Sequence, residues 1–239
     1  MKNTKSGLLR RLAAAFLVAV LVVAPLTIMS AEAAPAAPKN VWFARWDNTS
    51  FTACTIGMNN VSGVDGYQSV WCWTDGSHAK YNYWGTKGNY MKFTGLPKNH
   101  VSQVRVRSVK VLSSGRLSYS AWSKIAFITP SPVTVKVSVA NGNASNLQAR
   151  LKWNPVYGSS GYNVFLTSNP YGTWYWNQST NTKALSTSAV VKVYLRKKLK
   201  PYTIYYYRII TRRTYQGVFC TVPMPSSSFY NGAFRFRKY

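Results

Sequence analysis

The stretch LKWNPVYGSSGYNVFL, Leu151–Leu166, decides the fold because the chain contains it twice. A weaker copy, IGMNNVSGVDGYQSVW, occupies Ile56–Trp71, 95 positions earlier, and keeps the Asn, Val, Gly, Gly and Tyr residues at the same spacing. A second block repeats at a slightly longer offset: LPKNHVSQVRVRSV begins at Leu96 and LKPYTIYYYRIITR begins at Leu199. Repetition at such an interval indicates that one structural unit has been duplicated. A longer loop in the second copy accounts for the extra spacing.

The duplication predicts two related domains, 36–131 and 132–239, with their boundary in ITPSPV at Ile128–Val133. Beyond Pro35 the chain consists of short segments rich in Tyr, Trp, Thr and Val, separated by Gly, Asn, Ser and Pro. Such segments favour strands, and their number and length predict β-sandwiches. The residues that alternation places inside are Ala149, Leu151, Trp153, Tyr162, Val164, Leu166, Val104, Val106, Tyr207 and Ile209.

The first 33 residues have the organisation of a secretory signal peptide. A basic start, MKNTKSGLLRR, precedes the apolar run LAAAFLVAVLVVAPLTIM, and Ala31-Glu32-Ala33 provides a cleavage site after Ala33. The alternative is an uncleaved membrane anchor, but the run is barely long enough to span and Pro25 interrupts it. We expect no membrane span after the leader has been removed.

The second copy resembles a fibronectin type III domain. The residues that carry the resemblance are Leu151, Trp153, Gly161, Tyr162, Val164, Leu199, Pro201, Thr203, Tyr205, Arg208 and Ile209. The first copy keeps VRVRSV and ends with YSAWSKIAFI, which looks like the last strand of that family in secreted bacterial proteins. It departs from the pattern at Met58 and Ser102, where the family has Trp and Tyr. The resemblance implies an all-β chain with two immunoglobulin-like, fibronectin type III-like β-sandwiches in tandem, and a tyrosine corner at Tyr205.

Charge is the strongest compositional feature of the chain. It carries 30 Lys and Arg residues against four Asp and Glu residues, a formal net charge of +26. Residues 35–131 hold 11 of these cations with three Asp, whereas residues 132–239 hold 15 cations and no acidic residue. Cations with so few acidic neighbours cannot form a salt-bridge network, and their field attracts polyanions. We therefore expect an anionic partner: a wall polymer of the teichoic-acid kind, an acidic glycan or non-specifically bound nucleic acid.

Candidate polyanion contacts lie on two predicted strands, in a basic loop and at the C-terminal end. They are Arg105, Arg107, Arg196, Lys197, Lys198, Lys200, Arg208, Arg212, Arg213, Arg235, Arg237 and Lys238. The alternative is a solvated face that keeps the sheets soluble and protects their edges. An ordinary surface, however, intersperses acidic residues among its cations.

Aromatic residues gather after the repeated phrase in both copies. The clusters are Trp71, Trp73, Tyr81, Tyr83 and Trp84 in the first copy, and Tyr171, Trp174, Tyr175 and Trp176 in the second. Exposed aromatic faces stack on sugars, so carbohydrate-stacking candidates are Trp73, Trp84, Trp174 and Trp176, with Asn169 and Asn177 as available amides. Alternatively, these rings cover open sheet edges or the interdomain joint.

Residues for catalysis or metal binding are scarce. Beyond the leader the acidic residues are Asp47, Asp65 and Asp75, each in a turn-like context, and His78 and His100 fall in separate loops. Glycoside hydrolysis needs a pair of carboxyl groups, and zinc sites need closely spaced His and Cys ligands. We therefore expect a protein that is not an enzyme and uses no cofactor or metal.

The odd number of cysteines leaves at least one thiol unpaired in an exported chain. Alternation places Cys54 inward with Ile56 and Cys72 outward, which argues against a bond between these two, with Cys220 as the third cysteine. A Cys54–Cys72 disulfide remains the alternative.

These features predict a secreted, non-catalytic binding or adhesion protein, retained at the cell surface or wall by an anionic polymer. One alternative is a carbohydrate-binding module that uses its exposed Trp and Tyr residues. Another is a protein–protein scaffold that contacts a protein partner through its sheet edges and Cys72.

Overall fold

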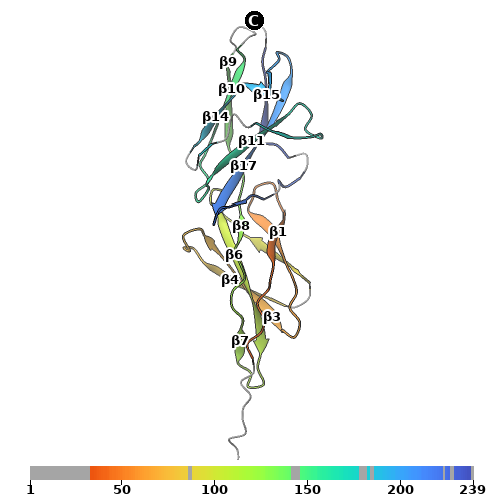
Figure 1. Cartoon of the computed structure of the whole chain (residues 1–239), viewed down its shortest axis with the longest axis vertical. Helices are drawn as coiled ribbons and strands as arrows, with labels where there is room; N and C mark the ends of the chain where they lie inside the picture. Colours follow the sequence, from red (N-terminus) through yellow and green to blue (C-terminus); the bar gives the residue numbers. More distant parts are fainter. Residues whose placement is uncertain are drawn as a thin grey trace, which may run out of the picture. The chain divides into compact units, whose positions relative to one another are not determined.

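A computed structural model describes residues 33–85, 88–140, 146–177, 182–183, 186–222, 224–226 and 229–237. The predicted leader lies outside these residues except for Ala33, and so does the candidate cation Lys238. Pro35–Tyr239 form one compact unit. All regular structure in the described residues is β-strand (Figure 1). Accordingly, the described part of the chain holds no helix that could cross a membrane.

Two antiparallel sheets build the first half, residues 36–131. One sheet has the order β1 (Val41–Trp46), β2 (Ala53–Met58) and β5 (Tyr90–Thr94). The other has the order β4 (Lys80–Gly85), β3 (Gly66–Trp73), β6 (Ser102–Val111) and β7 (Leu117–Tyr119), and β8 (Ala126–Ile128) also pairs with β6.

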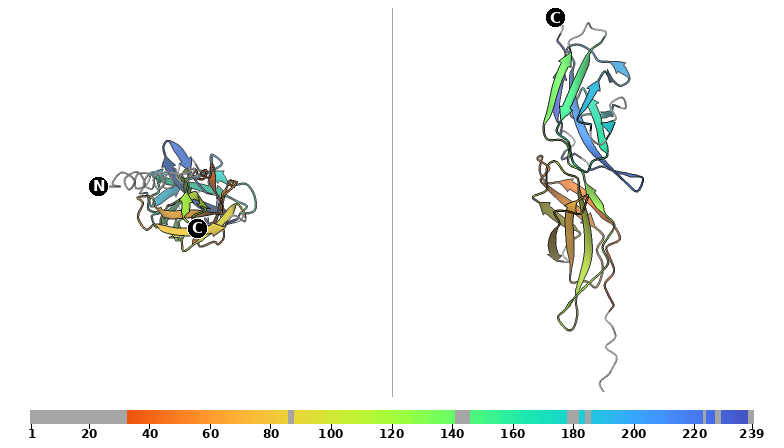
Figure 2. Two further views of the ribbon diagram at one scale, coloured as in Figure 1. Left: turned by 90° about the horizontal axis from the view of Figure 1, so that it is seen from below. Right: turned by 90° about the vertical axis from the view of Figure 1, so that its left-hand side faces the viewer.

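The second half, residues 132–239, repeats this arrangement (Figure 2). One sheet has the order β14 (Ser188–Val191), β10 (Gln148–Trp153) and β9 (Val135–Ala140). The other has the order β12 (Tyr175–Trp176), β11 (Gly161–Thr167), β17 (Ile204–Tyr215) and β18 (Val218–Cys220). Three further elements complete it: β13 (Thr182–Lys183) pairs with β11, β19 (Gly232–Arg235) pairs with β17, and β15 (Val193–Tyr194) forms a hairpin with β16 (Lys197–Lys198).

Equivalent strands of the two halves have equivalent neighbours. The order β1-β2-β5 corresponds to β9-β10-β14, and β4-β3-β6 corresponds to β12-β11-β17. The predicted fold class is therefore confirmed for the described residues: they are all-β, with two fibronectin type III-like β-sandwiches in tandem.

Each sandwich encloses a hydrophobic core to which both of its sheets contribute. Residues of the other half extend each core: Val101 and Phe127 join that of the second half, and Val222 joins that of the first. All ten residues predicted to point inward are buried, among them Leu151 and Val164 at 0 % exposure. Cys54 is also buried, as its register predicted, and burial together with the negative charge of Asp47 raises the pKa of its thiol to about 12. All three cysteines are free thiols in the structure.

The repeated phrase encodes the same hydrogen bond in both halves. The amide of Val61 donates to the hydroxyl of Tyr67 at 2.8 Å, and the amide of Val156 donates to the hydroxyl of Tyr162 at 2.7 Å. In each half a glycine between the two partners has a left-handed backbone: φ is 69° at Gly63 and 76° at Gly158. Glycine adopts this conformation without the steric cost that other residues meet.

A third tyrosine confirms the predicted tyrosine corner. The hydroxyl of Tyr205 accepts a hydrogen bond from the amide of Lys200 at 2.9 Å. In the first half, Ser102 stands at the equivalent position and is buried.

The segment that resembles a last strand in the first half is interrupted. β7 ends at Tyr119 and β8 begins at Ala126, with irregular chain between them. The hydroxyls of Ser120 and Ser123 accept hydrogen bonds from the amides of Ser108 and Val106 on β6, at 2.9 and 3.0 Å. These side chains satisfy backbone groups that a continuous strand would otherwise pair.

The boundary segment predicted between the two halves is buried from Thr129 to Pro132. The hydroxyl of Thr211, on β17, donates to the carbonyl oxygen of Pro130 at 2.6 Å, and the side-chain nitrogen of Asn231 donates to the carbonyl oxygen of Pro132 at 2.9 Å. The connection is therefore packed onto the second half rather than exposed to solvent.

We expect that replacing either buried tyrosine with phenylalanine will destabilise its sandwich. Tyr67→Phe or Tyr162→Phe leaves a backbone amide without its partner, which costs about 1–3 kcal/mol. Urea denaturation followed by tryptophan fluorescence measures the loss. The control is Tyr202→Phe, because Tyr202 is 61 % exposed. Equal midpoints for all three variants would contradict the structural role of the two hydroxyls.

Candidate functional site

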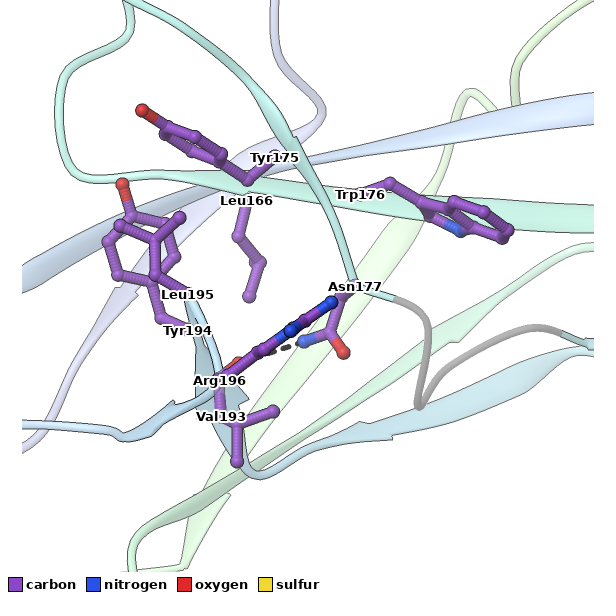
Figure 3. A pocket seen from close by; sticks show the side chains of 8 residues that line it. All are labelled: Leu166, Tyr175, Trp176, Asn177, Val193, Tyr194, Leu195 and Arg196. Carbon is purple, nitrogen blue, oxygen red and sulfur yellow. Dashed lines mark hydrogen bonds between the residues drawn. The ribbon is translucent and has the colours of Figure 1, made fainter.

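A cavity of about 490 Å³ opens in the second half beside the β15–β16 hairpin (Figure 3). Its lining residues come from β11, from β12 and the residue after it, and from the hairpin: Leu166, Tyr175, Trp176, Asn177, Val193, Tyr194, Leu195 and Arg196. The volume lies in the range of pockets that bind small organic ligands.

The hairpin has an unusual turn. Its two central residues, Leu195 and Arg196, both have positive φ angles of 51° and 61°. Two-residue hairpins prefer this geometry because it matches strand twist, but Asn and Gly normally occupy the two positions. Here a leucine and an arginine adopt the left-handed conformation, and both residues line the cavity.

Two tyrosines form an aromatic wall of the cavity. The rings of Tyr175 and Tyr194 meet edge to face at 5.9 Å, and Tyr194 packs in turn on the corner residue Tyr205 at 5.4 Å. Tyr175 remains 39 % exposed. Its neighbour Trp176 points to the opposite side of β12, as alternation on a strand requires (Figure 3).

A fixed amide lies at the base of this wall. Asn177 is buried, and its side-chain nitrogen donates to the carbonyl oxygen of Val193 at 2.9 Å (Figure 3). Its backbone amide donates to Val164 at 2.9 Å. These two hydrogen bonds, one from the side chain and one from the backbone, fix the position of Asn177 in the lining of the cavity.

Exposed cations lie on the hairpin that lines the cavity and directly after it. The four residues of the predicted basic loop, Arg196, Lys197, Lys198 and Lys200, are all exposed. Ion pairing does not neutralise them, because the one ion pair in the described residues joins Arg45 to Asp47. The basic loop predicted from the sequence therefore lies next to the cavity, and Arg196 belongs to both.

The other predicted polyanion contacts divide into exposed and engaged side chains. Arg105, Arg235 and Arg237 are exposed, whereas Arg107, Arg212 and Arg213 are half-buried. Separate contacts hold two of the half-buried residues. Arg107 lies 4.0 Å from the Tyr119 ring and 4.5 Å from the Trp122 ring. Arg213 donates to the carbonyl oxygen of Gly158 at 2.8 Å and lies 5.8 Å from the Phe127 ring.

The predicted polyanion contact Arg208 is buried in the structure. Arg208 is 8 % exposed, its guanidinium lies 3.7 Å from the centre of the Trp174 ring, and its side chain donates to the carbonyl oxygen of Phe229. Burial lowers the pKa of Arg208 to about 10, so the group stays charged at neutral pH. Alternation correctly placed Arg208 on the outer face of β17, but it could not show that Trp174 covers that position.

Three of the four predicted sugar-stacking rings have structural contacts instead. Trp174 covers Arg208, and the indole nitrogen of Trp84 donates to the hydroxyl of Ser69 at 2.8 Å. Trp73 is stacked between the imidazoles of His78 and His100, at centroid distances of 3.6 and 3.7 Å. Each of these three rings therefore has a partner side chain within the protein.

Trp176 keeps the exposure that stacking requires, at 44 %. Tyr194 was not among the sequence candidates, although it lies two residues before the basic loop, because its contact with Tyr175 depends on the path of the hairpin. In the described residues, no group of three His, Cys, Asp or Glu side chains could hold a metal ion.

Comparisons with known proteins find distant structural matches and no family. The sequence matches no protein-family model, and no curated protein is significantly similar to it. The FN1–FN3 domains of chicken CNTN1 match at 16 % identity over 86 % of this chain and 67 % of that chain, with a TM-score of 0.33. A segment of two fibronectin type III domains from chicken tenascin matches at 16 % identity over 83 % and 99 %, with a TM-score of 0.31. At these TM-scores, the fold class rests on the strand order of the chain itself.

Removing the ring over Arg208 should destabilise the second half. Trp174→Ala exposes apolar contacts and deprives a buried charge of its aromatic face, so we expect a loss of about 2–4 kcal/mol in the free energy of unfolding. Trp174→Phe keeps a ring and should lose less. Trp176→Ala is the matched control and should stay within about 0.5 kcal/mol of the wild type. Equal losses at both tryptophans, measured by thermal and urea denaturation, would contradict this account.

The stack around Trp73 should make the first half sensitive to acid. Burial lowers the pKa of His100, the charge of His78 lowers it further, and Asp75 opposes both effects. A histidine with a lowered pKa binds fewer protons when folded, so stability is complete above its unfolded pKa of about 6.5 and declines as the pH falls below it. Between pH 7.5 and 5, His100→Gln should lose less stability than the wild type. Identical pH dependence of the two urea midpoints would refute this expectation.

Proposed function

We propose that this protein is an exported, non-catalytic binding protein that attaches to an anionic polymer through the β15–β16 hairpin. The observation that carries the proposal is the position of this hairpin. It carries three exposed cations, Arg196, Lys197 and Lys198, next to an aromatic cavity that Arg196 lines, in a half of the chain that contains no acidic residue. A positive field of this kind speeds the encounter with a polyanion, and the cavity supplies close contacts after the encounter.

The contents of the cavity favour an acidic glycan over other polyanions. Tyr175 offers a ring face on which a sugar can stack, Asn177 offers an amide for hydroxyl groups, and Arg196 offers a guanidinium for an anionic group. A polymer that carries only phosphates would use the cations and leave the tyrosines without a role. Nucleic acid could use both, and the test below includes it as a separate outcome.

The positions of the three aspartates support a non-catalytic role. The carboxylate of Asp47 accepts hydrogen bonds from the hydroxyl of Thr55 at 2.9 and 3.0 Å. Asp65 and Asp75 accept backbone amide hydrogen bonds at 2.7 and 2.9 Å. Each carboxylate therefore has a local structural partner, whereas glycoside hydrolysis requires two of them to face one substrate.

Attachment to the outer cell surface follows from the proposal. The leader predicted from residues 1–33 would export the chain, and an electrostatic contact would then retain it at the wall or at another extracellular polymer. Binding of neutral carbohydrate is the second candidate function, and the exposed rings of Tyr175 and Trp176 favour it.

Removal of the hairpin charges tests the proposal. The variant Arg196→Gln/Lys197→Gln/Lys198→Gln should bind polygalacturonate with a flatter salt dependence. We expect the slope of log K against log salt to decrease by about 2–3, as for the loss of two to three ion contacts. The matched control removes the same charge from the other sheet, at Lys136, Arg150 and Lys152, which are all exposed.

Three ligands and two controls separate the outcomes. Affinity for polygalacturonate above that for a glycerol-phosphate polymer and for duplex DNA supports the acidic glycan, whereas the reverse order assigns a phosphate polymer. Equal effects of the two triple variants would show that net charge acts without a site, and would overturn the role of the hairpin. Salt-independent binding that Tyr175→Ala or Trp176→Ala abolishes would establish the neutral-carbohydrate alternative.

A further inference from the structure

A second hollow lies on the outer face of the first half, away from the hairpin cavity. It is an open groove of about 290 Å³ over β3, β4 and β6, lined by Val70, Cys72, Gly76, Ala79, Tyr81, Gln103, Arg105 and Trp122. The volume falls just below the range of about 300–1,000 Å³ for drug-sized ligands, so it suits a small ligand such as one ring with its substituents.

Strand register brings the principal groups of the groove into one row. Val70 on β3 lies directly opposite Tyr81 on β4 and directly opposite Arg105 on β6. Directly opposed side chains on one face of a sheet lie about 5 Å apart at Cβ. An apolar floor is therefore flanked by an aromatic ring on one side and a guanidinium on the other.

The second aromatic wall is held rigidly. The Trp122 ring stacks on the Arg107 guanidinium at 4.5 Å, and Arg107 is fixed by a 2.7 Å hydrogen bond to the side-chain oxygen of Gln68. Tyr81 and Trp122 lie 6.4 Å apart with their planes tilted by 47°. Tyr81 itself is 57 % exposed, so its ring is available to a ligand.

A fixed amide completes the groove. The side-chain nitrogen of Gln103 donates to the carbonyl oxygen of Trp73 at 3.1 Å and to the sulfur of Cys72 at 3.2 Å. Arg105 is exposed, and the one ion pair in the described residues, Arg45 with Asp47, does not involve it. The groove thus combines two rings, a positioned amide and an arginine without a carboxylate partner in the described chain.

The second half shows what can stack on an arginine at the position of Arg105. In the repeat, Arg105 corresponds to Arg208: each lies on the central strand of its sheet, opposite Val70 and Phe165 respectively. In the second half a flat ring of the protein itself, Trp174, stacks on this arginine at 3.7 Å. In the first half the corresponding arginine is open to solvent.

We infer that the groove of the first half binds a carboxylated sugar. The apolar face of the pyranose ring stacks on Tyr81 and Trp122, its carboxylate pairs with the Arg105 guanidinium, and its hydroxyls bond to the Gln103 amide. Arginine favours a carboxylate because its planar fork matches the two oxygens. The inference gives the proposed acidic glycan a second contact, and two contacts on one polymer increase avidity well beyond either alone.

The test uses the purified protein with its hairpin charges removed by Arg196→Gln/Lys197→Gln/Lys198→Gln. In this background, an oligogalacturonate trimer should still bind in isothermal titration calorimetry at low ionic strength. Adding Arg105→Gln should raise the Kd about tenfold, as loss of a charge-assisted hydrogen bond does, and adding Tyr81→Ala should raise it severalfold. The controls Arg116→Gln and Tyr90→Ala should stay within about twofold, because Arg116 and Tyr90 are comparably exposed but lie outside the groove.

The possible results distinguish this inference from the proposed function. If the hairpin variant loses all trimer binding while the wild type binds, the hairpin site stands and the groove is refuted. If the hairpin variant binds as the wild type does and Arg105→Gln abolishes binding, the groove stands and the hairpin proposal fails. Equal Kd values for Arg105→Gln and Arg116→Gln, equal binding of the neutral galactose trimer, or tighter binding of adenosine monophosphate would each overturn the carboxylated-sugar assignment.

Discussion

Both sandwiches depend on one hydrogen bond, in which a tyrosine hydroxyl accepts from the backbone amide of a valine six residues upstream. Tyr67 and Val61 make this bond in the first half, and Tyr162 and Val156 make it in the second. The chain crosses here from one sheet to the other, and the bond satisfies a backbone group that would otherwise lie unpaired near the core. Because the tyrosine begins the central strand, its position also fixes the register of that strand. The outer-face residues of β3 and β11 then occupy defined places. Val70 of β3 lines the groove of the first half, and Phe165 of β11 lies opposite the covered Arg208 in the second half.

The two halves use the same framework to present different outer faces. One outward position carries Arg105 on β6 in the first half and Arg208 on β17 in the second. The indole of Trp174 covers Arg208 so closely that the charge is buried, with aromatic and carbonyl contacts in place of water. Arg105 has no such cover and stands at the edge of a groove. Duplication therefore preserved the core and the turn, where packing allows few changes, while the outer faces diverged, because substitutions there cost little stability.

The high net charge of the chain is not a uniform coat of available cations. Arg107 and Arg208 are held against aromatic rings, and Arg213 is held by a carbonyl oxygen near another ring. Arginine suits these places better than lysine because its planar, weakly hydrated guanidinium stacks on rings. The cations of the β15–β16 hairpin are instead exposed, next to a cavity with tyrosine walls. Recognition of a polyanion therefore depends on where the free cations meet a shaped surface, and total charge alone does not identify that place.

The sequence by itself determined the all-β fold, the duplication, the inward residues and the tyrosine corner. Alternation along strands and the spacing of Val, Gly and Tyr are local properties, so they can be recognised without knowing which strands are neighbours. The basic loop could also be recognised from the sequence, because its cations are close together in the chain. Only the tertiary structure decided which rings and cations are covered: that Trp174 lies over Arg208, that Tyr194 meets Tyr175, and that Trp122 faces Tyr81 across the groove. These contacts join residues on different strands, or on segments that leave the strands, and their exposure depends on the path of the chain in three dimensions rather than on sequence spacing.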